Sequence, residues 1–238
     1  DWSSDVCSSD LSVGVGRTGD HRPVFARRCR TRGMDESPSG PDPDPDSDFE
    51  ARLRAGVALY TAGRYRAAHD PWEAAWHEAA GDDDPFLHGL VQFTAAIHHG
   101  LGGNREGAVG LARSAQGYLA GLPSDYRGID LDTVRGFLPE LERDPGAAAR
   151  EPPELRYEGR RLTFSDLEFP AARHAAAAVA EDLDDYDEDL VERAAEYAVA
   201  DLDVGKATTP FVALLLDFVD PGETGRALVY ARLEQHVR

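Results

Sequence analysis

A histidine and a carboxylate four residues apart, His69 and Glu73, are the side chains of this 238-residue chain best placed to do chemistry. Residues at positions i and i+4 lie on one face of a helix, so both groups can reach the same point in space. Two tryptophans, Trp72 and Trp76, flank the pair, and five of the eight histidines fall between positions 69 and 99. The spacing therefore predicts a polar site in this window without defining its reaction.

This pair has three chemical interpretations. His69 and Glu73 can ligate a metal ion, with His98 or His99 as a third ligand. They can also act as a general base and its orienting carboxylate, or form a hydrogen-bonded pair buried between helices. A lone i, i+4 pair is common by chance and the chain has no His-Glu-x-x-His motif, so the structural network is favoured. Whether a metal is bound stays open, with His69, Glu73 and His99 as its ligands in that interpretation, and the sequence requires no cofactor.

The third helix of the core, expected over residues 85–101, is predicted to complete the cluster. It places Gln92 and His99 on one stripe. A buried Gln92 needs a hydrogen-bond partner, and His69 and Glu73 are candidates. If the cluster is functional, His69 is the ligand or base, Glu73 orients it, and Gln92 binds the substrate.

The tryptophans at helical spacing are first interpreted as core residues. Large aromatic side chains with this spacing ordinarily pack inside the protein. Trp72 and Trp76 can also form the wall of an apolar binding pocket beside the cluster, and the two interpretations are compatible. Of the other histidines in the window, His77 and His88 are expected to face solvent.

These residues also carry a family resemblance. The ordered elements are Leu59-Tyr60-x-x-Gly63-x-Tyr65-x-x-x-His69-x-x-Trp72-Glu73-x-x-Trp76, then Gly89-Leu90-Val91-Gln92-x-x-Ala95-Ala96-x-x-His99, then Gly103-Asn104. With them, residues 50–122 resemble the domain-of-unknown-function 309 family, whose members are small all-helical proteins of bacteria and archaea. The resemblance implies a helical fold and carries no established activity. The family's usual His-Glu pair reads His69-Asp70 in this chain, and Pro71 follows it.

Helical periodicity along the chain predicts an all-α fold. Short loops with turn glycines at Gly63 and Gly103 imply antiparallel neighbours. We therefore expect a compact antiparallel helical bundle of two helical hairpins plus C-terminal helices. Residues 49–123 form the family's helical core in this interpretation, 124–170 a connector with one helix, and 171–238 a C-terminal helical part.

Proline complicates the second helix of the core. In one interpretation the helix begins at Arg64 and kinks at Pro71. In the other, a new helix begins with Asp70 as its N-cap, and Glu73 closes a capping box. An interior proline costs a helix about 3 kcal/mol, so a break or kink just after His69 is expected. Under the second interpretation Glu73 is a cap rather than a catalytic group.

The C-terminal part is expected to hold four helices, at about 170–183, 187–204, 209–219 and 222–237. In the second of them, the side chains predicted to face inward are Leu190, Ala194, Tyr197 and Val204, while the carboxylates stay in solvent. Thr209 as N-cap and Pro210 at the first helical position mark the start of the third helix.

The first 48 residues are expected to lie outside the fold. The opening DWSSDVCSSDL matches an in-frame translation of a common sequencing adapter, and the sole methionine is Met34, so residues 1–33 are interpreted as non-native upstream sequence. Both cysteines lie in that segment, which removes disulfide and thiolate chemistry from the remainder. Residues 34–48, rich in proline and aspartate, are predicted to form a disordered acidic tail.

The charge balance is strongly acidic. Aspartate and glutamate number 44 against 25 lysines and arginines, a formal net charge of −19, and Lys206 is the only lysine. Excess carboxylate with arginine in place of lysine is typical of proteins in molar salt, where the Debye length falls to about 3 Å. This pattern favours relatives in salt-loving archaea. The alternative is an acidic protein that avoids nucleic acid or binds cations.

The partners follow from what the sequence lacks. No apolar run approaches the roughly 18 residues of a membrane span, and no basic-aromatic face indicates nucleic-acid binding. We therefore expect a cytoplasmic protein. One function is a ligand- or metal-binding role for the His/Glu/Gln cluster, and the alternative is a module that binds a protein partner or a second copy through its helical hairpins. A cluster reached by solvent favours the first function, and a sealed cluster favours the second.

Overall fold

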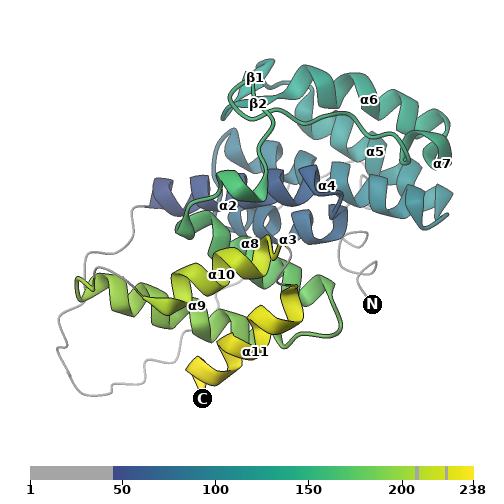
Figure 1. Ribbon diagram of the computed structural model, residues 1–238. Helices are drawn as coiled ribbons and strands as arrows, with labels where there is room; N and C mark the ends of the chain where they lie inside the picture. Colours follow the sequence, from purple (N-terminus) through teal and green to yellow (C-terminus); the bar gives the residue numbers. More distant parts are fainter. Residues whose placement is uncertain (1–44, 207–208, 223–224) are drawn as a thin grey trace, which may run out of the picture. The chain divides into compact units, whose positions relative to one another are not determined.

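The computed structural model describes residues 45–206, 209–222 and 225–238 (Figure 1), which all belong to one compact unit. In chain order its α-helices are α2 (Pro45–Thr61), α3 (Tyr65–Trp76), α4 (Asp83–Leu101), α5 (Arg105–Leu119), α6 (Leu131–Arg143), α7 (Pro145–Ala148), α8 (Phe169–Asp182), α9 (Glu188–Asp203), α10 (Pro210–Val219) and α11 (Arg226–Val237). The other regular elements described are the antiparallel pair β1 (Asp125–Tyr126) and β2 (Ile129–Asp130), and the 3-10 turn η1 (Phe164–Asp166). The predicted all-α fold is confirmed.

Neighbouring helices of the first half pack as antiparallel hairpins. α2 packs against α3, α3 against α4 and α4 against α5, while α6 covers α5 and α7 contacts α4 and α6. The turns after α2 and α4 contain Gly63 and Gly103, whose φ angles of 74° and 78° lie in the left-handed region that favours glycine. Gly63 N–H donates to the Tyr60 carbonyl and Arg64 N–H to the Leu59 carbonyl, which closes the end of α2. Both predicted hairpins are confirmed.

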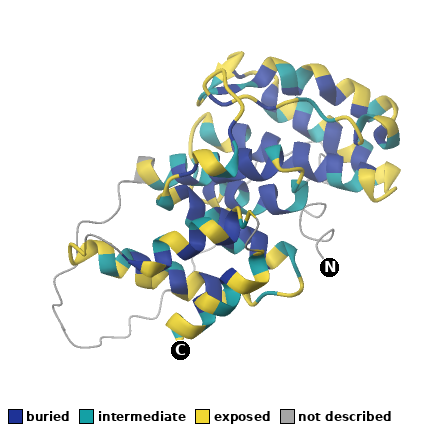
Figure 2. Ribbon diagram, in the orientation of Figure 1, coloured by how far each residue is buried: buried dark blue, intermediate teal, exposed yellow. Residues whose placement is uncertain are grey.

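Helix α8 connects the hairpins to the C-terminal helices. It packs against α2 and α3 and also against α9 and α10, and α11 packs against α9 and α10. Small side chains permit these close contacts, since Ala172, Ala175 and Ala176 on α8 have no exposed surface. Figure 2 shows buried residues in dark blue along α4, which packs against both α3 and α5. Side chains of α8 therefore lie beside those of α2 and α3.

Proline does not interrupt the second helix. α3 runs from Tyr65 to Trp76 with Pro71 inside it, so the interpretation with Asp70 as an N-cap is wrong. The compensating contact is made by Trp72, which is fully buried and donates its indole N–H to the Leu53 carbonyl at 3.1 Å. Burying an aromatic side chain contributes roughly 4–6 kcal/mol, against about 3 kcal/mol for an interior proline. Tertiary packing therefore outweighs the local helix preference.

The predicted acidic tail is shorter than expected at its C-terminal end. α2 begins at Pro45, so the last part of the segment 34–48 is helical. The reason is Asp48, whose carboxylate forms ion pairs with Arg52 one turn along and with Arg173 on α8. The predictions for residues 1–44, including the non-native segment 1–33, lie outside the described residues.

The C-terminal helices lie near the predicted positions, except that α11 begins at Arg226 rather than at 222, and two side chains predicted to face inward are exposed. Leu190 and Ala194 on α9 are buried as expected, but Tyr197 and Val204 are 44% and 74% exposed. Val204 follows the last residue of α9, so it leaves the helical stripe from which its inward direction was inferred. No helix in residues 45–206, 209–222 and 225–238 is long and apolar enough to cross a membrane.

Candidate functional site

His69 lies in the interior of the fold. Its side chain is 1% exposed, and both ring nitrogens are buried. The Nδ1 atom is 3.6 Å from Asp70 Oδ1 and 3.5 Å from Glu73 Oε2, distances that are long for a hydrogen bond but short enough for an ion pair. The predicted His69–Glu73 proximity is therefore present, and solvent does not reach the imidazole.

Charged side chains form ion pairs where α3 meets α8, and His69 belongs to this group through its contact with Asp70. Arg66 on α3 pairs with Glu181 at 3.2 Å and with Asp182 at 3.4 Å. Burial raises the pKa of Glu181, and the negative charge of Asp70 raises it further. We call Arg66, His69, Asp70, Glu181 and Asp182 the α3–α8 charge seam. It holds two carboxyl groups, Asp70 and Glu181, close enough to repel each other.

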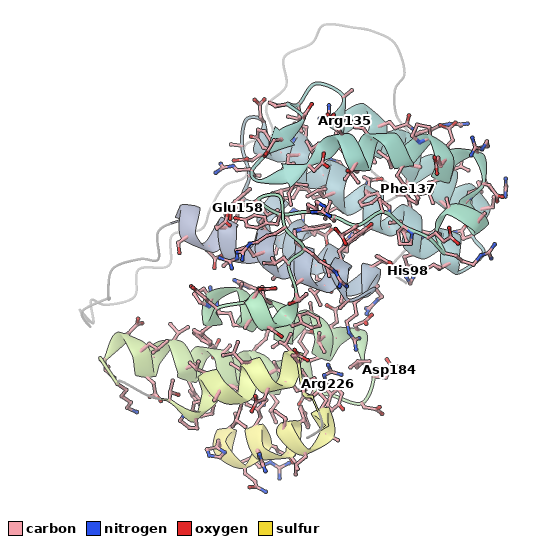
Figure 3. The ribbon with its side chains drawn as sticks, turned by 45° about the horizontal axis from the view of Figure 1, so that its top comes forward. His98, Arg135, Phe137, Glu158, Asp184 and Arg226 are labelled. Carbon is pink, nitrogen blue, oxygen red and sulfur yellow. The ribbon has the colours of Figure 1, made fainter. Side chains whose placement is uncertain are left out.

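The neighbouring histidines of α4 belong to different surroundings. Burial lowers the pKa of His98, labelled in Figure 3, and the positive charge of Arg66 lowers it further. His99 Nδ1 lies 2.9 Å from Asn104 Nδ2. Asn104 also caps α5 by accepting the Gly107 N–H at 3.0 Å. His98 thus lies beside the charge seam, whereas His99 is tied to the turn between α4 and α5.

Gln92 is buried as expected, and its amide nitrogen lies 3.3 Å from His88 Nε2. This partner was not among the candidates predicted for it. His88 was also expected in solvent and is instead 8% exposed, because its ring lies between Trp76 and Tyr118 at centroid distances of 4.1 and 3.8 Å. The prediction for His88 is wrong because a stripe on one helix does not report which aromatic rings of other helices cover it. His77 is exposed as predicted.

The two tryptophans have separate structural roles. Trp72 fills the space against α2, where Gly56 leaves room for its indole. Trp76 covers His88 and donates its indole N–H to Asp84 Oδ1 at 2.7 Å. The core interpretation is confirmed for Trp72, while Trp76 is partly exposed.

The described residues contain no group of three or more His, Cys, Asp or Glu side chains arranged to hold a metal ion. His69, Glu73 and His99 are thus not brought together as a ligand set. The polar core around His69 and Gln92 consists of neighbouring pairs of side chains, and these side chains do not converge on one point.

A second polar network, not predicted from the sequence, joins α2 to α8. The Asp48 carboxylate pairs with Arg52 at 2.7 Å, Arg173 at 2.5 Å and His174 Nε2 at 3.0 Å. Burial alone would raise the pKa of Asp48, but His174 and the two arginines hold it below its usual value. Burial lowers the pKa of His174 to about 4, and the neighbouring charge of Arg173 adds to this effect. His174 is therefore a neutral imidazole near pH 7.

This network borders a surface hollow along α8 and α9, which we call the α8–α9 hollow. Its main chamber has a volume of about 450 Å³ and is lined by Arg173, His174, Ala177, Glu192, Ala195, Glu196, Val199, Ala200 and Asp203. An adjoining chamber of about 290 Å³ is lined by Ser47, Asp48, Phe169, Pro170, Arg173, Val199, Leu202 and Asp203. The two chambers share Arg173, Val199 and Asp203. The hollow thus combines a fixed polar network with apolar walls.

Local signals for this second site are present in the sequence. Asp48 and Arg52 have the i, i+4 spacing of a helical ion pair, and Arg173-His174 interrupts an alanine-rich stretch. Assigning Asp48 to an acidic tail concealed the first signal. The contact between residues 48 and 174 depends on how α2 packs against α8, which no local pattern reports.

The family match described next covers the first polar core and not the hollow. Residues 53–111 match the family described as Domain of unknown function (DUF309). An uncharacterized protein of Aquifex aeolicus (strain VF5) is 27% identical over 108 residues, which are 44% of this chain and 31% of that protein. The chain thus spans about a third of the length of this relative. The family match includes His69, Glu73, Gln92 and His99, and it ends before α8 and α9.

Proposed function

We propose that this protein is a non-catalytic binding module, in which the polar core around His69 stabilises the helices and the α8–α9 hollow binds a small ligand. The observation that carries the first half of this proposal is the 1% exposure of His69. A general base must come within hydrogen-bond reach of the proton that it removes. Both nitrogens of His69 are buried, so a substrate in the hollow or in solvent has no path to them.

The neighbouring polar groups support a structural role. Gln92 and His88 are both buried and lie within hydrogen-bond distance of each other. Buried polar groups that satisfy one another favour a single packing arrangement, because any other arrangement leaves a donor or acceptor without a partner. In this proposal the polar core sets how α3, α4 and α5 pack.

The hollow supports the second half of the proposal. Small-molecule sites usually occupy roughly 300–1,000 Å³ and combine apolar walls with a few fixed polar groups. The main chamber of about 450 Å³ falls in this range, and two of its polar side chains, Arg173 and His174, are held in place by the Asp48 carboxylate of α2. Ligand binding at the surface also requires no access to the buried histidine.

The structural role of His69 is tested by His69→Gln, with His77→Gln as its matched control. His77 lies one turn of α3 from the same Glu73 carboxylate, at 3.9 Å, but its side chain is 66% exposed. Loss of a buried polar interaction costs about 1–3 kcal/mol, so His69→Gln is expected to lower the free energy of unfolding in urea by that amount, and His77→Gln to leave it unchanged. Equal stabilities for His69→Gln and the wild type would refute the structural role.

A further inference from the structure

We infer that a cavity at the turn between α2 and α3 binds a small carboxylate with a flat apolar body. The cavity, which we call the α2–α3 cavity, has a volume of about 210 Å³. Its lining comes from the end of α2, the start of α3 and the connector residues 152–161. It shares no lining residue with the α8–α9 hollow, so this inference goes beyond the proposed function and does not depend on it.

The turn between the two helices places two tyrosine rings side by side at this cavity. Gly63 turns the chain in the left-handed conformation at a φ of 74°, and Tyr65 then begins α3. The rings of Tyr60 and Tyr65 meet edge to face, with centroids 5.2 Å apart and planes inclined by 68°. Tyr60 is 4% exposed, whereas Tyr65 is only partly buried. The aromatic wall of the cavity is therefore held in place by packing.

The connector completes the apolar part of the cavity. Tyr60 donates its hydroxyl proton to the Pro153 carbonyl at 2.8 Å, which fixes the connector against α2. Pro152 and Pro153 both line the cavity, and so does the buried Leu155. Aromatic and proline rings present flat apolar surfaces, and a planar ring packs favourably against the edge or the face of a tyrosine. The walls thus suit a ligand with a flat apolar body.

The polar groups of the cavity are mainly hydrogen-bond donors that the fold does not use. Thr61 and Tyr65 line the cavity, and among the described residues neither of their hydroxyl groups has a hydrogen-bond partner. Arg161 directs one N–H to the Thr61 carbonyl at 3.5 Å. A guanidinium has five N–H donors and no acceptor, so most of its donors stay available. A ligand that supplies acceptors would complement these groups.

The charges of the lining favour an anion. Two lining residues are charged, and one of them, Glu154, is paired with Arg156 at 2.7 Å. The other, Arg161, is exposed and forms no ion pair within the part of the chain that the structure describes. A guanidinium binds a planar carboxylate through two parallel hydrogen bonds. The available donors and the unpaired positive charge therefore point to the same class of ligand.

The charge of the whole protein makes such binding specific. The chain has a formal net charge of −19, so its overall field repels anions rather than collecting them. A carboxylate that binds must gain its affinity from local groups. This separates the inference from diffuse electrostatic attraction, which would favour cations over the entire surface.

The test is an NMR titration of the full chain with benzoate at physiological ionic strength. The wild type is expected to bind saturably, and Arg161→Gln to bind about tenfold more weakly or less, because a charge-assisted hydrogen bond is lost. Tyr65→Phe, which removes one hydroxyl, is expected to weaken binding roughly threefold or more. The matched control is Arg160→Gln, which removes the same charge from an exposed neighbour that does not line the cavity, and it is expected to keep the wild-type affinity.

Equal affinities of Arg161→Gln and the wild type would place benzoate elsewhere and overturn the inference. Equal weakening in Arg160→Gln and Arg161→Gln would also overturn it, as would the absence of saturable binding. The contact with the Thr61 carbonyl gives Arg161 a second role as a cap of α2. If Arg161→Gln melts at a lower temperature than the wild type, Tyr65→Phe decides the matter, and an unchanged affinity in that variant would refute the site.

Two further probes test the two parts of the ligand class. Benzamide has the shape of benzoate without its charge and is expected to bind at least tenfold more weakly. Acetate keeps the carboxylate without the ring and is also expected to bind more weakly, since it covers less of the apolar wall. Equal affinity for benzamide would overturn the role of the anion, and equal affinity for acetate would overturn the role of the flat apolar body.

Discussion

His174 on α8 and Asp48 in the first turns of α2 are joined by a 3.0 Å contact between Nε2 and Oδ1. This contact links two helices that are more than 100 residues apart in sequence and lies at the edge of the α8–α9 hollow. Arg173 and Arg52 reach the same carboxylate. The start of α2 is therefore held by α8, and the same contacts fix Arg173 and His174 at the hollow.

The His174 contact predicts a loss of stability in mild acid. Burial lowers the pKa of this histidine to about 4 in the folded protein, against 6.5 in the unfolded chain. The unfolded state therefore takes up the proton first, and stability that is present above pH 6.5 is lost as the pH falls toward 4. We expect the free energy of unfolding to fall by about 2 kcal/mol between pH 7 and pH 5 from this group alone.

Urea unfolding of His174→Gln at pH 7 and pH 5 measures this contribution. Glutamine can donate to Asp48 but does not titrate, so the pH-dependent loss is expected to shrink in this variant. His236→Gln serves as the control, because His236 is exposed near the end of α11. An identical loss in the wild type and in His174→Gln would exclude His174 as its source.

A second prediction concerns the close contact between Gly56 and Trp72. A Cβ atom at position 56 would lie 2.2 Å from the indole nitrogen of Trp72, a fully buried side chain. Gly56→Ala is therefore expected to destabilise the protein by roughly 2–3 kcal/mol, since overpacking forces the ring or the backbone to move. Gly117→Ala on α5 has open space around it and is expected to stabilise by about 0.5–1 kcal/mol. Thermal unfolding of both variants decides the matter, and similar melting temperatures would contradict the packing argument.

Local sequence signals were sufficient for most of the helices. Gly63 ends α2 in the left-handed conformation, Asn104 caps α5 and Thr209 caps α10 with Pro210 after it. Each of these interactions lies within a few residues of chain, so the residue types alone predict it. Pro71 marks the limit of such signals, because the packing of α3 against α2 overrides the local preference.

The candidate sites were predicted less well because they depend on contacts between helices. Glu73 lies near His69 as expected, since both are on one helix. The ring of His88 is covered by Tyr118 from α5, and Asp48 is held by His174 from α8. No period or spacing along the chain reports either contact. The residue types predict a polar core, but only the packing of the helices shows which polar groups are buried in it.

The buried His88–Gln92 pair predicts a non-additive pair of substitutions. His88→Phe keeps a ring between Trp76 and Tyr118 but removes the acceptor that lies 3.3 Å from the Gln92 amide. Leaving a buried amide without this partner is expected to cost about 1–3 kcal/mol. Adding Gln92→Leu removes the amide as well, so the double variant is expected to recover most of that loss. A double-mutant cycle by urea unfolding measures the coupling, and strictly additive effects would refute it.

The carboxyl groups of the α3–α8 charge seam predict a loss of stability as the pH rises, which is opposite to the effect predicted for His174. Burial, the charge of Asp70 and the charge of Glu188 raise the pKa of Glu181, so the folded protein binds a proton there more tightly than the unfolded chain does. A carboxyl group with a raised pKa contributes stability that is present in acid and is lost as the pH rises through the unfolded and then the folded pKa. Glu181→Gln removes this dependence while keeping a group of the same shape. We therefore expect its stability, relative to the wild type, to improve steadily from pH 4 to pH 7.

Two controls make the Glu181 prediction specific. Glu140→Gln removes an exposed carboxylate on α6 and is expected to show no such trend relative to the wild type. Asp70→Asn removes the repelling charge and leaves Glu181 in place, so it is expected to reduce the wild-type pH dependence in the same direction. Arg66 pairs with Glu181 at 3.2 Å and offsets part of the repulsion. When Arg66→Gln is present in both the reference protein and the Glu181→Gln variant, the pH trend between them is therefore expected to grow. A trend of the opposite sign in Glu181→Gln would mean that the Arg66 ion pair outweighs the repulsion between the two carboxylates.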